Sequence, residues 1–172
     1  MKSIFNATIA ILLALVHIGC GSKSSAPAPP EVSGILTPVK WSFTVNKISD
    51  TEAELVMKAT IDKGWHLYSM NQEIPEGPET GPMSLTVEFE KNANYSLDGP
   101  IIESTPENSD DPVFNMKVKF FEHEAVYRQK IKILTKDGFS VTGLLNFQSC
   151  DDAMCIPPTD DEFKFEIPES AV

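Results

Sequence analysis

The sequence predicts an all-β protein built as an antiparallel sandwich. Several strand-length segments alternate apolar and polar residues or are rich in β-branched and aromatic types. Turn residues separate these segments, and no long stretch has the 3.6-residue period of an amphipathic helix. Short strands at this spacing are typical of a single immunoglobulin-like domain. The expected strands are residues 39–48, 53–61, 65–69, 83–89, 117–121, 125–134, 139–147 and 163–167.

The first residues have the layout of an export signal. Lys2 precedes the apolar run 4–16, which is shorter than the roughly 20 residues that a membrane-spanning helix needs. The run leads into residues 16–20 (VHIGC), which resemble a lipobox, the motif whose cysteine becomes lipidated. We therefore expect residues 1–19 to be a lipoprotein-type signal peptide and Cys20 to carry the lipid. Cleavage without lipidation is the alternative.

Residues 20–38 form the expected tether between the lipid and the folded domain. Ser, Ala and Pro dominate this stretch, and such a composition buries no core and stays extended, reaching on the order of 50 Å. The residue after Cys20 is Gly21, not the Asp that marks inner-membrane retention, which favours the outer membrane. We expect a periplasm-facing lipoprotein of the bacterial cell envelope whose domain spans residues 39–172.

Charge and length exclude several classes of protein. The formal net charge of the 172 residues is −11, and no cluster of Lys or Arg occurs. Nucleic acids and anionic lipid surfaces both require basic patches, so neither is an expected partner. The length beyond the leader suits one domain of about 150 residues, and we expect a monomer.

Two long polar stretches and one tight turn are expected between the strands. Residues 70–82 and 99–115 are polar and rich in Pro, so we expect irregular loops, which often carry function on a rigid sandwich. Residues 132–141 (KILTKDGFSV) predict a hairpin, because Asp137-Gly138 can supply the positive φ angles of a tight primed turn.

Cys150 and Cys155 are the two cysteines left after Cys20, and an even number in an exported chain predicts a disulfide. Bridged Cα atoms usually lie about 4.4 to 6.8 Å apart, so the segment between them must curl back. Closing so short a loop stabilises a fold by only about 2 kcal/mol. This small value favours a redox role over a structural one. Asp151 and Asp152 lie between the cysteines and disfavour a thiolate, so exchange should depend on a partner's thiolate.

Three blocks of sequence resemble one family, the N-terminal periplasmic domain of the thiol-disulfide interchange protein DsbD. The first is residues 64–69 (GWHLYS), and the second is residues 111–114 (DPVF) ahead of residues 127–129 (YRQ). The most specific block is residues 147–158, in which Phe-Gln-Ser-Cys is followed by a second Cys and Pro-Pro. The resemblance covers residues 39–168.

The resemblance implies an immunoglobulin-like domain that relays electrons through a reversible disulfide. It implies that Cys155 forms the mixed disulfide with a partner and that Cys150 resolves it. Phe114, with Asp111 beside it, matches the cap that shields the cysteines, while Tyr68 and His66 match the aromatic strand beneath the site. The chain departs from the family by a cysteine spacing one residue shorter. It also ends at Val172, so the membrane and thioredoxin-like domains are expected to be separate proteins.

The sequence thus predicts an envelope thiol-disulfide carrier whose activity requires partner proteins. Expected partners are thioredoxin-like or DsbD-type redox proteins, together with the membrane through the lipid anchor. No cofactor or metal is expected, because His66 and His123 are too few and too scattered for zinc, and no His follows Cys150 to complete a blue-copper site. The alternative is a non-catalytic immunoglobulin-like binding module held by a permanent disulfide.

Overall fold

The computed structural model describes residues 36–73, 81–111 and 114–169. Within that part of the chain, no helical segment has the length and hydropathy that crossing a membrane requires. The strands are β1 (Val39–Lys47), β2 (Glu52–Ile61), β3 (His66–Tyr68), β4 (Thr86–Phe89), β5 (Tyr95–Glu103), β6 (Glu107–Asp111), β7 (Met116–Phe121), β8 (Glu124–Ile133), β9 (Phe139–Phe147), β10 (Ser149–Cys150) and β11 (Thr159–Ile167). The predicted all-β class is confirmed, and the pairings between neighbouring strands are antiparallel.

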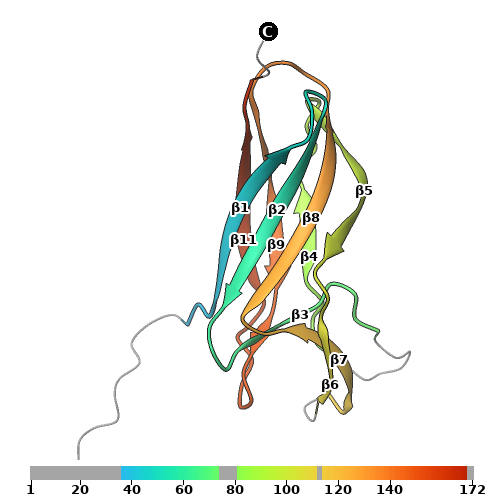
Figure 1. The fold of residues 1–172 in the computed structure, drawn as a ribbon. Helices are drawn as coiled ribbons and strands as arrows, with labels where there is room; N and C mark the ends of the chain where they lie inside the picture. Colours follow the sequence, from blue (N-terminus) through green and yellow to red (C-terminus); the bar gives the residue numbers. More distant parts are fainter. Residues whose placement is uncertain (1–35, 74–80, 112–113, 170–172) are drawn as a thin grey trace, which may run out of the picture. The chain divides into compact units, whose positions relative to one another are not determined.

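Two sheets make the sandwich (Figure 1). One has the strand order β1-β2-β8-β5, and the other has the order β11-β9-β4. Alternate residues of each strand point inward, as the two-residue period of a strand requires. Leu55 and Met57 of β2 are fully buried, and so are Val141 and Leu145 of β9. All four side chains belong to one hydrophobic core. The sandwich is therefore a rigid frame whose ends carry the connecting segments.

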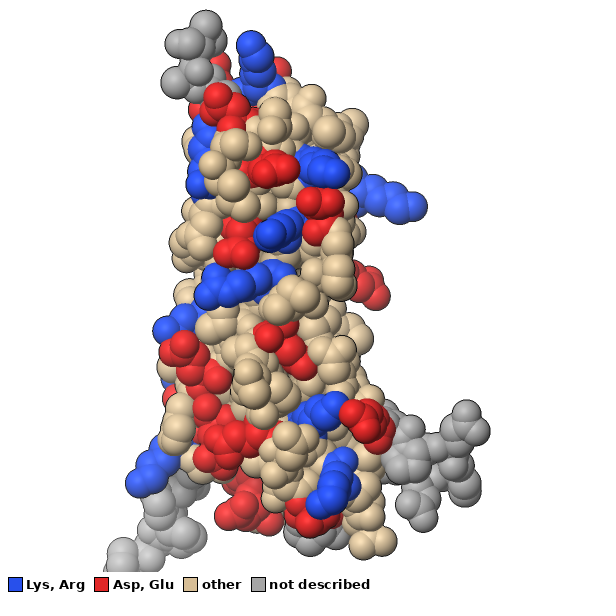
Figure 2. Space-filling view, turned by 45° about the vertical axis from the view of Figure 1, so that its right-hand side comes forward, with Lys and Arg blue, Asp and Glu red and all other residues tan. Residues whose placement is uncertain are grey.

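The outer face of the β1-β2-β8-β5 sheet is covered by paired charges. Arg128 lies 3.1 Å from Glu54, and Lys58 lies 2.6 Å from Glu124. Figure 2 shows Lys and Arg side chains interspersed with Asp and Glu side chains over the visible face of the sandwich. Exposed pairs of this kind contribute about 0 to 1 kcal/mol each. The balanced charge gives this face little electrostatic attraction for a charged partner.

The expectation that residues 99–115 form an irregular loop is wrong. β5 runs through Gly99 and Pro100, because the register against β8 shifts between Asp98 and Ile102 and Gly99 adopts a φ of 78° there. Such a bulge accommodates residues that an ordinary strand excludes. The buried Gln129 donates from Nε2 to the Gly99 carbonyl oxygen over 3.1 Å, which anchors the bulge.

β6 was missed for a different reason. Its sequence, ENSDD, is polar and mostly exposed, whereas the strand pattern used for the sequence predictions requires alternate apolar residues. Among the described strands, β6 lies at the edge of its sheet and pairs with β7 alone. Edge strands commonly carry charged residues, which deter pairing with other chains.

The hairpin predicted for residues 132–141 is also wrong. β8 already pairs with β2 and β5, and β9 pairs with β11 and β4, so residues 134–138 cross between the two sheets. Within the described chain, the glycines with positive φ are Gly64 and Gly99, and Gly138 is not among them. A Cβ at Gly138 would lie 3.2 Å from the Glu169 backbone nitrogen, so glycine permits close approach to the segment after β11.

Candidate redox site

A small third sheet, β10-β3-β7-β6, holds the predicted site residues at one end of the sandwich (Figure 1). β10 pairs with β3 so that Cys150 lies opposite His66, and β3 pairs with β7 so that Tyr68 lies opposite Phe120. β7 in turn pairs with β6, which ends at Asp111. Segments that lie far apart in the sequence therefore meet beside Cys150.

Cys150 and Cys155 form a disulfide with an S–S distance of 2.02 Å and a Cα–Cα distance of 4.0 Å. The intervening segment curls back because the Asp151 carboxylate accepts hydrogen bonds from the backbone N–H groups of Ala153, over 2.8 Å, and Met154, over 2.7 Å. These two hydrogen bonds lower the pKa of Asp151. Asp151 therefore stabilises the turn as well as adding negative charge beside the sulfurs.

The two sulfurs differ in access to solvent. Cys150 is 1% exposed, whereas Cys155 is partly exposed. Met154, next to Cys155, is 50% exposed. A nucleophile approaching from solvent can therefore reach Cys155 before Cys150.

A second, smaller hydrophobic cluster surrounds the disulfide. Tyr68, Val118 and Cys150 are its buried members. The Phe114 ring packs edge-on against the Tyr68 ring, with centroids 6.1 Å apart. The partly buried residues that pack against this cluster are Phe114, Met116, Phe120 and Cys155. Phe114 lies in the connection between β6 and β7, so the position of this hairpin determines how closely its ring covers the cluster.

Hydrogen bonds join β3 to that connection. His66 Nε2 lies 3.1 Å from the Tyr68 hydroxyl, which donates to Asp111 Oδ2 over 3.2 Å. Asp111 Oδ1 accepts the backbone N–H of Phe114, also over 3.2 Å. Burial raises the pKa of Tyr68, and Asp111 raises it further, so the hydroxyl keeps its proton. His66, Tyr68, Asp111 and Phe114 are thus linked in one continuous chain.

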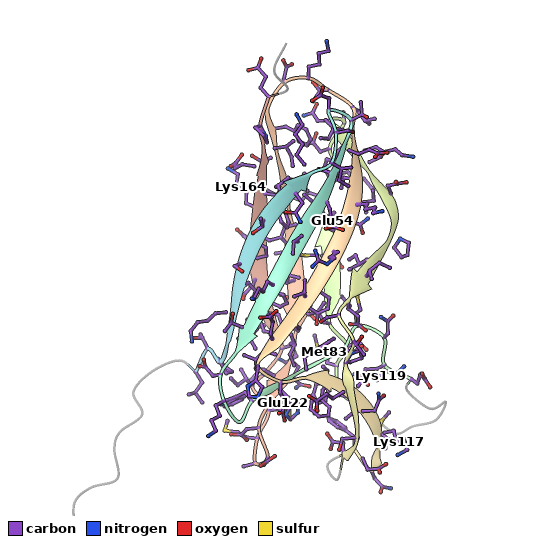
Figure 3. The ribbon with its side chains drawn as sticks, viewed as in Figure 1. Glu54, Met83, Lys117, Lys119, Glu122 and Lys164 are labelled. Atoms are coloured by element: carbon purple, nitrogen blue, oxygen red, sulfur yellow. A yellow bond between two sulfur atoms is a disulfide. The ribbon has the colours of Figure 1, made fainter. Side chains whose placement is uncertain are left out.

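An open hollow of about 230 Å³ lies beside this chain. Burial lowers the pKa of His66, although the carboxylates of Asp111, Glu122, Asp152 and Asp151 oppose this effect. The residues that line the hollow are His66, Ser109, Asp110, Asp111, Val118, Phe120, Glu122 and Asp152. Figure 3 labels Glu122 at this end of the sandwich. Acidic side chains therefore predominate among the charged residues that line the hollow.

Four residues around the disulfide were predicted from the sequence, but the contribution of β7 was not. The four are His66, Tyr68, Asp111 and Phe114. Met116, Val118 and Phe120 belong to the cluster at the disulfide, while Phe121 belongs to the main core. The alternation along this strand was a usable signal, because residues two apart share a face. Cys20 lies outside the described residues. Within the described part, no three His, Cys, Asp or Glu side chains gather as metal ligands.

The fold and site define an immunoglobulin-like domain with a disulfide near its surface. The family model for the N-terminal part of the thiol:disulfide interchange protein DsbD matches residues 34–167. The chain therefore belongs to this family, and the resemblance seen in the sequence is confirmed. No curated protein matches the chain.

Three solved structures are similar to this chain, and the first of them supports the fold. The N-terminal periplasmic domain of ScsB from Proteus mirabilis is 19% identical, with a TM-score of 0.51, and the match covers 75% of this chain and 47% of that one. The reduced DsbD N-terminal domain from Neisseria meningitidis is 16% identical, with a TM-score of 0.49 over 74% of this chain and 86% of that one. A chain in the structure of the complex between the DsbD and PilB N-terminal domains from Neisseria meningitidis is 17% identical, with a TM-score of 0.44. That match covers 81% of this chain and 88% of that one.

Proposed function

We propose that this chain is a thiol-disulfide exchange carrier, which passes reducing equivalents from a membrane-bound or thioredoxin-like donor to oxidised envelope proteins. The observation that carries the proposal is the unequal exposure of the bridged sulfurs, with Cys155 accessible and Cys150 buried. Family membership supports it, because the family model describes thiol:disulfide interchange. A disulfide between cysteines five positions apart also adds only about 2 kcal/mol of stability to a sandwich that has its own core.

The exchange has two steps in each direction. A donor thiolate attacks Cys155 Sγ, the Cys150–Cys155 bond breaks, and Cys150 leaves as a thiolate that takes up a proton. The donor's second thiolate then attacks the donor sulfur that is bonded to Cys155. This step releases reduced Cys155 and leaves the donor with a disulfide. Delivery reverses these steps: the Cys155 thiolate attacks an acceptor disulfide, and Cys150 resolves the mixed disulfide. Two electrons and two protons move in each full exchange.

The surroundings of the pair restrain spontaneous reaction. Asp151 lies in the loop, Asp111 and Glu122 line the neighbouring hollow, and nearby negative charge disfavours a thiolate. The site also lacks the helix N-terminus that lowers cysteine pKa values in thioredoxin-type motifs, since the described site consists of strands and turns. Phe114 packs in the same cluster as both sulfurs and acts as their shield. Cys155 stays partly exposed beside Phe114, and docking of a partner moves Phe114 aside to open the site fully.

The location proposed for the carrier is the periplasmic side of the cell envelope. Residues 1–19 act as a lipoprotein signal peptide, Cys20 carries the lipid, and residues 20–38 tether the domain of residues 39–172. The export-signal pattern supports this location, as does the structural similarity to the N-terminal periplasmic domain of ScsB. Gly21 after the lipidated cysteine favours the outer membrane over the inner one.

Mixed-disulfide trapping tests the proposed function. The full chain with Cys150→Ser leaves Cys155 without its resolving partner, so it should accumulate covalent adducts in bacterial envelope extracts that disappear on reduction. Thioredoxin-like proteins are the expected adducts. Cys155→Ser is the matched control, because it leaves the buried Cys150 and should trap far less. If Cys150→Ser traps nothing and physiological reductants leave the wild-type bridge intact, the chain is a binding module with a structural disulfide.

A further inference from the structure

The two cysteines face each other across a narrow antiparallel pair. Cys150 and Cys155 form an antiparallel β-bridge, and their Cα atoms are 4.0 Å apart. On one side of the bridge, the Ile156 backbone N–H donates to the Ser149 carbonyl oxygen over 2.9 Å. On the other side, the residue after Cys150 donates to the carbonyl oxygen of the residue before Cys155, also over 2.9 Å. Residues between two such bonds form a non-hydrogen-bonded pair, whose side chains lie closest together.

The turn that joins the two cysteines is closed by the Asp151 side chain. Asp151 Oδ1 accepts the backbone N–H groups of Ala153, over 2.8 Å, and of Met154, over 2.7 Å. Aspartate is favoured at the start of a turn because its carboxylate reaches the N–H groups that follow. None of the hydrogen bonds that close this turn involves a sulfur atom, so they do not require the disulfide. The turn should therefore stay closed while Cys155 is bonded to a partner.

Resolution of a mixed disulfide needs the two sulfurs to stay close while they are not bonded to each other. In this step the Cys150 thiolate attacks Cys155 Sγ, the Cys150–Cys155 bond forms, and the partner's sulfur leaves as a thiolate that takes up a proton. Cys150 is 1% exposed and lies in β10, so Cys155 must be held beside it. Holding a nucleophile next to its target raises the rate of attack.

We propose that Asp151 is a positioning residue of the exchange reaction, whose carboxylate keeps the turn closed while the disulfide is open and so speeds the attack of Cys150 on Cys155. The inference rests on the proposed function. The charge of Asp151 disfavours the Cys150 thiolate, whereas its hydrogen bonds hold the target in place. Asp152 adds the same charge but is exposed, and among the described residues none of the hydrogen bonds of this turn ends on its side chain. Asp152 is therefore the matched control.

The test measures the two steps separately. The reagent is an aromatic disulfide that releases one coloured thiolate when Cys155 attacks it and a second one when Cys150 resolves the adduct. The reduced full chain is used, with Cys20→Ser in every sample so that only the pair reacts. Asp151→Ala and Asp152→Ala should have similar first steps, because each removes one charge. In the second step, Asp151→Ala should be about tenfold slower than Asp152→Ala, the effect of losing one or two hydrogen bonds.

Asp151→Asn separates the hydrogen bonds from the charge. Its amide oxygen can still accept both N–H groups, so its second step should be about as fast as that of Asp152→Asn. Equal second-step rates in Asp151→Ala and Asp152→Ala would overturn the role of Asp151. A second step as slow in Asp151→Asn as in Asp151→Ala would also overturn it, because the retained acceptor would then make no difference.

A second readout uses the wild-type chain and does not depend on the folding of a variant. In the reduced protein, the backbone amides of Ala153 and Met154 should shift together in NMR spectra as the Asp151 carboxylate is protonated. The midpoint should lie below the usual range of an aspartate, because these N–H groups lower the pKa of Asp151. Amides that do not follow Asp151 would show that the turn opens with the disulfide, which would overturn its positioning role.

Trapping separates this inference from the carrier function. The adducts of Cys150→Ser form without the resolving step, so adding Asp151→Ala to that variant should leave their amount unchanged. A large loss of adducts in the double variant would place the effect of Asp151 on the first step and overturn its role in resolution. Absence of adducts in Cys150→Ser itself would overturn the carrier function instead.

Discussion

Replacing Cys155 with serine is expected to reduce disulfide exchange to the uncatalysed background. Without the Cys155 sulfur, a partner can attack neither the bridge nor a mixed disulfide, and the remaining Cys150 is 1% exposed. The assay is multiple-turnover reduction of an oxidised acceptor by the full chain, with a thioredoxin-like protein as donor. Cys150→Ser should stop at a different point: the accessible Cys155 attacks one acceptor molecule and then stays in the mixed disulfide.

Comparing the two variants tests which sulfur attacks the acceptor and which one resolves the mixed disulfide. Both variants lose turnover, so turnover alone does not separate them. The separating measurement is the mass of the protein after one exposure to oxidised acceptor, where Cys150→Ser should gain one acceptor molecule and Cys155→Ser should not. The reverse result would mean that Cys150 is the attacking sulfur, contrary to its burial.

Gly143→Ala is expected to destabilise the fold by about 3 kcal/mol, at the upper end of overpacking effects. Gly143 lies in β9 between β11 and β4, where it pairs with Phe163 and Phe89. A Cβ there would overlap the Glu88 carbonyl oxygen and the Phe163 ring. A backbone oxygen held in a sheet and a ring that is 2% exposed have little room to move.

Urea unfolding of the oxidised full chain measures this effect, and Gly138→Ala is the matched control. At Gly138 the nearest atom to an added Cβ lies 3.2 Å away, at the Glu169 backbone nitrogen, and the chain there is outside the strands. The control should therefore lose much less stability. Equal stability of both variants would show that β9 and β4 do not pack as closely as described.

The sequence predicted the main strands because their alternation is strong. The buried positions of β2 and β8 repeat every second residue, and the predicted boundaries lie within one residue of those observed. Alternation states which face of a strand is buried, but not which strand lies beside it. For this reason residues 132–141 fitted a hairpin and a crossover between sheets equally well, and the structure has the crossover.

The cysteine pair could be found from its spacing and setting, while the rest of the site could not. His66, Tyr68, Asp111 and Phe114 were nominated through a family resemblance, and their hydrogen bonds depend on the pairing of β10, β3, β7 and β6. That pairing requires β6, whose polar sequence hid it from pattern analysis. The acidic hollow likewise depends on side chains that three separate segments bring together.

The reduction potential of the Cys150–Cys155 disulfide shows whether the bridge is exchangeable or structural. The full chain is equilibrated with glutathione or dithiothreitol buffers of defined ratio, the thiols are alkylated, and the oxidised fraction is read by mass. Structural disulfides typically lie below about −300 mV, and exchangeable ones are less negative. A carrier disulfide should have a potential less negative than about −300 mV. A value far below that mark would contradict the carrier function and identify the bridge as a structural element of a binding module.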